Sequence, residues 1–109
     1  MWSFVTEVCL AQPTAACNPN PADGRVNVSE NQNLAWQCSD SQCPGIVATH
    51  DVYFGRTPSL GPEHLLGNTA SKAWSLPVLQ KDTTFYWQIV TKDANGVTPG
   101  PVWSFTTKP

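Results

Sequence analysis

The chain has 109 residues, of which 13% are charged and 40% are hydrophobic, and its formal net charge at pH 7 is −2. A chain of this length forms one domain and buries roughly 60 to 70% of its unfolded surface, so it has a hydrophobic core of its own. The apolar content excludes disorder, and no apolar run approaches the roughly 20 residues of a membrane span. The 6 Lys and Arg residues form no basic stripe. We therefore expect no membrane insertion and no nucleic-acid partner.

A short sequence motif near the start of the chain is repeated near its end. The segment WSFVTE at residues 2–7 recurs as WSFTTK at residues 103–108, an offset of 101 residues. About 100 residues is the length of one small β-sandwich. We therefore interpret residues 1–17 as the last strand of a preceding, similar repeat followed by a cysteine-stapled linker. Residues 18–109 are then one complete domain.

The first of these segments has apolar side chains but no core of its own. Its apolar residues are Trp2, Phe4, Val5 and Val8. An isolated apolar strand seeks the open edge of a sheet. Donation of residues 2–8 to a neighbouring copy is therefore a second hypothesis, and repeated head to tail it would build oligomers or filaments.

Four cysteines follow, at Cys9, Cys17, Cys38 and Cys43. An even number in a small domain indicates two disulfides and an oxidising compartment, and the spacings do not match the paired short spacings of a zinc site. Three pairings are possible. We favour Cys9 with Cys17 and Cys38 with Cys43, because each pair closes a short local loop.

The remaining chain is typical of short strands joined by turns. The 10 prolines argue against long helices, and Val26 and Val28 alternate in a short first strand. Residues 56–72 read as a loop with one short edge strand at most. Further alternation predicts strands at residues 33–38, 50–55, 73–76, 84–92 and 102–107. About seven strands without a helix indicate a Greek-key sandwich, with a small OB-like barrel as the competitor.

Alternation also sorts the aromatic residues. Four tryptophans fall on the apolar phase of their strands and are predicted to be core: Trp36, Trp74, Trp87 and Trp103. Tyr53 and Tyr86 fall on the outward phase. If their strands are neighbours, they form a small exposed aromatic pair, which is the best candidate for stacking on a sugar.

Residues 18–108 resemble a fibronectin type III domain of the kind found in extracellular bacterial and archaeal proteins. The marks are NPNPADGRVNVS at the start, LAW at 34–36, DVYFG at 51–55, LPVLQKDTTFYWQIVTKDANG at 76–96 and GPVWSFTT at 100–107. The last two segments are the most specific. The resemblance implies an all-β, immunoglobulin-like Greek-key sandwich of about seven strands.

The sequence departs from that family in three places. Phe85 stands where the family usually has the tyrosine of its tyrosine corner, so that hydroxyl is missing. His50 stands where an aromatic residue is common. Cys38 and Cys43, in the loop after the second strand, are not a general family feature, and no RGD tripeptide is present.

No pattern of residues points to catalysis or to a bound ion. His50 and His64 belong to no recognisable nucleophile or metal motif. Asp93 and Asn95 imitate the start of a calcium loop, but Ser104 stands where the bidentate glutamate is required. We therefore expect no catalytic, cofactor-binding or metal-binding residue.

The sequence thus favours a non-enzymatic structural or adhesion module, one repeat of a larger cell-surface or secreted protein. Its expected partners are neighbouring repeats or other copies of the protein, and a surface glycan or protein is a further candidate. Strand donation by residues 2–8 is the alternative. An accessory carbohydrate-binding module of a secreted hydrolase comes third.

Overall fold

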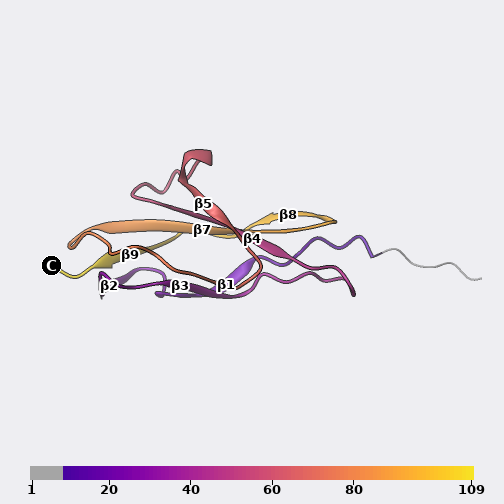
Figure 1. Cartoon of the computed structure of the whole chain (residues 1–109), viewed down its shortest axis with the longest axis horizontal. Coiled ribbons are helices and arrows are strands. Elements are labelled where there is room, and N and C mark those ends of the chain that lie inside the picture. The colour runs from indigo at the N-terminus through magenta and orange to yellow at the C-terminus, as the bar shows by residue number, and fades with distance from the viewer. Residues whose placement is uncertain (1–8) are drawn as a thin grey trace, which may run out of the picture.

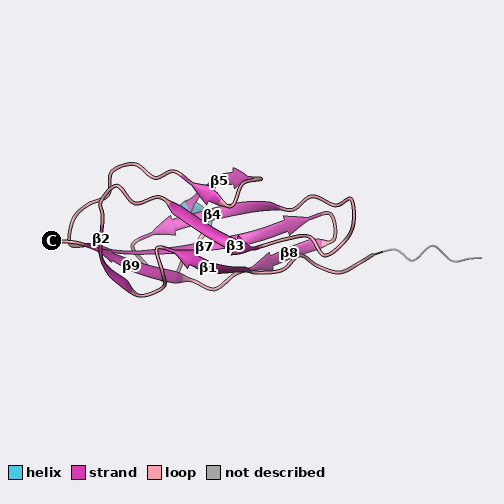
Figure 2. Ribbon diagram, turned by 90° about the horizontal axis from the view of Figure 1, so that it is seen from below, coloured by secondary structure: helices cyan, strands magenta, loops and turns pink. Residues whose placement is uncertain are grey.

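The computed structural model of the chain, described here for residues 9–109, is almost entirely β-structure in two sheets (Figures 1 and 2). A three-residue 3-10 helix, Pro62–His64, is the one helical turn in this range. The strands are β1 Ala16–Asn20, β2 Arg25–Val28, β3 Leu34–Cys38, β4 Thr49–Gly55, β5 Leu65–Thr69, β6 Ala73–Trp74, β7 Thr84–Asp93, β8 Gly96–Pro99 and β9 Trp103–Thr107. Within residues 9–109, no helix has the length and apolar character needed to cross a membrane.

The two sheets form a sandwich-like pair of layers. One sheet has the order β1-β3-β6, and the other has the order β2-β9-β7-β4-β5. The remaining strand, β8, pairs with the last part of β7, whereas β9 pairs with its first part. All strand pairs are antiparallel except β2 with β9, which is parallel. The N-terminal segment that precedes β1 and the C-terminus lie at opposite ends of the long axis of the molecule (Figure 1).

The core between the sheets is built largely from aromatic rings. Trp87 of β7 lies at its centre, with ring centroids 6.3 Å from Trp36 of β3 and 4.8 Å from Trp103 of β9. The ring centroid of Phe85 of β7 lies 5.7 Å from that of Phe105 of β9. The core prediction is confirmed for Trp36, Trp87 and Trp103, whereas Trp74 is half-buried at the edge of the core.

Alternating apolar residues predicted the long strands well. The structure has strands at all the ranges with strong alternation, and β7 extends one residue beyond the predicted 84–92. The predicted edge strand within residues 56–72 is β5, at the edge of the larger sheet.

The start of the domain differs from the prediction. The segment predicted as the first strand is β2, and a strand precedes it: β1 begins at Ala16 and crosses the predicted boundary between residues 17 and 18. Its sequence, ACNPN, looks like a turn, and Asn18 has a positive φ of 49°. Long-range pairing with β3, from Ala16 opposite Cys38 to Asn20 opposite Ala35, extends this segment in spite of its composition. Trp2, Phe4, Val5 and Val8 lie outside the described residues.

Candidate functional site

The four cysteines form two disulfides, but not in the predicted pairing. Cys9 is bonded to Cys43 and Cys17 to Cys38, with Cα atoms 5.7 and 5.5 Å apart. The local pairs Cys9–Cys17 and Cys38–Cys43 are therefore wrong. The cause is β1: because it pairs antiparallel with β3, with Cys17 opposite Gln37, it places Cys17 beside the end of β3. Cys9 is then carried on to the loop that follows β3.

Asn95, in the turn between β7 and β8, holds the segment that precedes β1. Its Nδ2 donates to the carbonyl oxygen of Cys9 at 2.9 Å and to that of Ala11 at 3.2 Å, and it lies 3.2 Å from Sγ of Cys43. The backbone nitrogen of Asn95 donates to Oδ1 of Asp93 at 2.7 Å, and this hydrogen bond fixes the turn. Asp93 and Asn95, the residues that imitate a calcium loop, therefore hold a hairpin turn and the N-terminal segment.

Two further side chains bind the same segment. Nε2 of Gln42 donates to the carbonyl oxygen of Gln12, and Oγ1 of Thr98 donates to that of Pro13, both at 2.7 Å. Residues 9–13 therefore run between the β3–β4 loop and the β7–β8 hairpin, bonded to both. We call this end of the molecule, formed by residues 9–14, 39–47 and 93–98, the stapled end.

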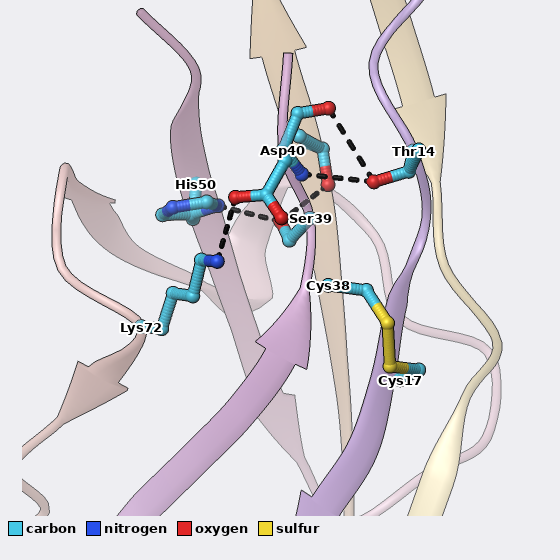
Figure 3. A network of polar contacts seen from close by, with 8 residues as sticks. Thr14, Cys17, Cys38, Ser39, Asp40, His50 and Lys72 are labelled. Carbon is cyan, nitrogen blue, oxygen red and sulfur yellow. Dashed lines mark hydrogen bonds and ion pairs between the residues drawn. A yellow bond between two sulfur atoms is a disulfide. The ribbon is translucent and has the colours of Figure 1, made fainter. Parts of the chain in front are cut away.

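A buried polar cluster extends from Ser39 of the stapled end into the space between the sheets (Figure 3). Oγ of Ser39 is 2.6 Å from Nδ1 of His50 and 2.5 Å from Oγ1 of Thr91. These three residues are at most 2% exposed. His50 lies opposite Thr91 in the β4–β7 ladder, so both side chains point between the sheets, and Ser39 reaches them from the end of β3.

Burial disfavours the protonated form of the His50 ring. Loss of hydration lowers the pKa of His50 from its usual 6.5, the positive charge of Lys72 lowers it further, and the negative charge of Asp40 opposes the shift. A hydroxyl beside an imidazole is the geometry of an activated nucleophile. Ser39, however, has no exposed surface through which a substrate could reach its oxygen. The cluster is arranged to connect the end of β3 to β4 and β7.

Asp40, the residue after Ser39, makes an ion pair and two hydrogen bonds next to this cluster (Figure 3). Nζ of Lys72 lies 2.6 Å from Oδ1 of Asp40. The amide nitrogen of Thr14 donates to the carbonyl oxygen of Asp40 at 2.8 Å, and the Asp40 amide donates to Oγ1 of Thr14 at 2.9 Å. The segment before β1, the end of β3 and the turn before β6 are thereby joined.

The structure places Tyr53 and Tyr86 on neighbouring strands. In the β4–β7 ladder, Tyr53 lies opposite Gln88 and Tyr86 opposite Gly55, so the two tyrosines are diagonal neighbours on the outer face of the larger sheet. Both are half-buried rather than fully exposed. Leu65 of β5, which is 44% exposed, lies opposite Tyr53 and adds apolar surface.

Residues 9–109 contain no surface pocket and no group of three or more His, Cys, Asp or Glu side chains placed to bind a metal. Sequence reasoning identified the cysteines and the tyrosines. It singled out Asn95 only as part of an incomplete calcium loop, and it missed Ser39 and Thr91, whose only signal is a polar residue close to a strand end.

Comparison of the sequence with protein-family models finds no match, and comparison with curated proteins finds none either.

Proposed function

We propose that this chain is a non-enzymatic structural module of an extracellular or cell-surface protein, a fibronectin type III-like repeat that spaces or joins its neighbours. The observation that carries the proposal is the placement of the chain ends. The N-terminal segment is bonded at one end of the sandwich, and the C-terminus leaves from the other (Figure 1). Such a module extends a chain of domains by its own length and holds the chain that enters it in a fixed direction.

The strand order supports the fibronectin type III-like part of the proposal. In immunoglobulin-like sandwiches, strands A, B and E share one sheet, and C, F and G share the other. Here β1, β3 and β6 share one sheet, and β4, β7 and β9 are consecutive in the other. Assigning β1 as A, β3 as B, β6 as E, β4 as C, β7 as F and β9 as G reproduces that arrangement.

The disulfides indicate an oxidising environment, because cytosolic thiol systems keep such cysteines reduced. They support a location outside the cell for the module. Its partners are then neighbouring repeats, other copies of the same protein, or a surface protein or glycan.

Strand donation is the second candidate, and the motif repeated at residues 2–7 and 103–108 favours it. The later copy of this motif forms β9, which lies between β2 and β7 and buries Trp103 and Phe105. A segment with the same pattern has the residues needed to occupy the same place in another domain.

Light scattering separates these two candidates. We expect the full chain, and the chain lacking residues 1–8, both to be monomers when the protein acts as a spacer. Oligomers of the full chain that disappear on removal of residues 1–8 would overturn the spacer proposal in favour of strand donation.

The tyrosine pair supports the third candidate, a carbohydrate-binding face, because sugars stack on aromatic rings. A broad glycan array tests it, with Tyr53→Ala and Tyr86→Ala as variants. Binding that both variants abolish would support a sugar-binding role, and absence of binding across the array would refute it.

A further inference from the structure

We propose that the Cys9–Cys43 disulfide is a load-bearing bypass: tension entering at Cys9 passes directly to Cys43 and β4, so that residues 10–42 neither carry the load nor extend. The inference rests on the proposed function, since a spacer in a chain of domains transmits tension between its ends. It adds a mechanical property to that function, namely a limited extension set by the disulfides.

The two disulfides are nested, and this arrangement makes the bypass possible. The outer disulfide closes a loop with a sequence separation of 34, and the inner one, Cys17–Cys38, has a separation of 21 and lies inside that loop. The loop contains β1, β2 and β3. A covalent bridge between Cys9 and Cys43 is far stiffer than the hydrogen bonds that hold these strands, so the tension follows the bridge.

The segment beyond Cys43 leads into the strands best placed to resist pulling. β4 begins at Thr49, near the stapled end, and is paired with β7 along its whole length, from Thr49 opposite Lys92 to Gly55 opposite Tyr86. β7 is paired in turn with β9, whose last residue, Thr107, leads to the C-terminus at the other end.

The direction of these strands determines how the load acts on their hydrogen bonds. β4 and β9 are both antiparallel to β7 and therefore run in the same direction. Pulling on the start of β4 and on the end of β9 slides these strands along β7. The hydrogen bonds of an antiparallel ladder are perpendicular to the strands. They are therefore loaded together in shear rather than broken one after another.

Without the outer disulfide, the load takes a weaker route. Tension then passes through residues 10–16 to Cys17 and crosses the inner disulfide to Cys38, so the hydrogen bonds that hold residues 9–14 and the loop after β3 carry it before β4 does. The hydrogen bonds of Asn95 and Thr98 to the N-terminal segment then carry part of the load as well. We therefore expect the outer disulfide to raise the force at which the module unfolds.

The disulfides also fix how far the unfolded module extends. An extended chain spans at most about 3.6 Å per residue. When both disulfides are reduced, the outer separation of 34 residues adds about 120 Å to the length of the stretched chain. Opening the outer loop alone leaves the inner separation of 21 closed, so 34 less 21, or 13 residues, add about 45 Å.

Single-molecule force spectroscopy on the full chain tests the proposal, with cysteine-free protein handles fused at both termini. We expect the unfolded, stretched chain to be about 120 Å longer in the presence of a dithiol reductant than without it. The variant Cys9→Ser/Cys43→Ser will be about 45 Å longer than the oxidised wild type and will unfold at lower force. The variant Cys17→Ser/Cys38→Ser is the matched control, because its missing bridge lies within the bypassed loop. Its extension and its unfolding force will stay near those of the oxidised wild type.

The length measurement is made on the unfolded chain, so it remains valid even where a variant folds poorly. An oxidised wild type that stretches as far as the reduced protein overturns the bypass. Growth in the extension of Cys17→Ser/Cys38→Ser also overturns it, as does an unfolding force that Cys9→Ser/Cys43→Ser leaves unchanged. These outcomes are independent of the spacer proposal, whose own test is the oligomeric state of the chain with and without residues 1–8.

Discussion

Acidification will destabilise this protein through one buried side chain, His50. In the folded state, burial and the charge of Lys72 lower the pKa of His50, while Asp40 acts in the opposite direction. In the unfolded chain, the imidazole titrates at its usual pKa of 6.5. Below that pH the unfolded state binds a proton at His50 more readily than the folded state does, so the free energy of unfolding falls as the pH falls. Above it, both states are neutral and the contribution of His50 to stability is complete.

The size of the effect follows from proton linkage. One proton bound only by the unfolded state gives a slope of at most about 1.4 kcal/mol per pH unit. Between pH 6.5 and about pH 5, His50 accounts for at most about 2 kcal/mol. That is a substantial part of the stability of a small domain, which is about 5 to 15 kcal/mol.

Urea unfolding at a series of pH values, followed by tryptophan fluorescence with both disulfides oxidised, measures this slope. His50→Gln will remove most of the slope between about pH 5 and pH 6.5. His64→Gln is the matched control, because His64 lies in the 3-10 helix, away from the buried cluster, and its variant will keep the slope. A slope that persists in His50→Gln, or one that vanishes in His64→Gln, would show that the reasoning is wrong.

Two further variants test the polar contacts of the stapled end. Ser39→Ala removes the shared partner of His50 and Thr91 and leaves two buried polar atoms without it, so we expect a loss of about 2 to 4 kcal/mol in urea unfolding; a loss below about 0.5 kcal/mol would contradict the cluster. Asn95→Ala removes the bonds to the carbonyl oxygens of Cys9 and Ala11, and we expect about 1 to 2 kcal/mol of destabilisation and faster hydrogen exchange in residues 9–14. Thr84→Ala, at an exposed position, is the control variant. If hydrogen exchange in residues 9–14 is no faster in Asn95→Ala than in Thr84→Ala, the role of Asn95 is contradicted.

The sequence was most informative where side-chain alternation and burial coincide. β7 was predictable because Phe85, Trp87 and Ile89 alternate with more polar residues, and they are indeed buried between the sheets. β3 and β9 were predictable for the same reason. Their apolar residues recur with a period of two because one face of the sheet is buried.

The remaining features depend on contacts between residues far apart in the chain. β1 carries the turn-forming sequence NPN, and only its pairing with β3 makes it a strand. The disulfide pairing was wrong for the same reason, because loop length favoured short closures while the β1–β3 register placed Cys17 beside Cys38. The buried cluster combines Ser39, His50 and Thr91, which no local pattern connects.

The position of the cysteines along the chain has a consequence for synthesis. All four lie within the first 43 residues, whereas the central strand β7 begins at Thr84. A chain that emerges from its N-terminus therefore exposes every thiol long before most of the core exists. At that stage loop-closure entropy favours the short pairs, Cys9 with Cys17 and Cys38 with Cys43. The observed connectivity then requires either early association of β1 with β3 or thiol–disulfide exchange in the compartment where the protein matures.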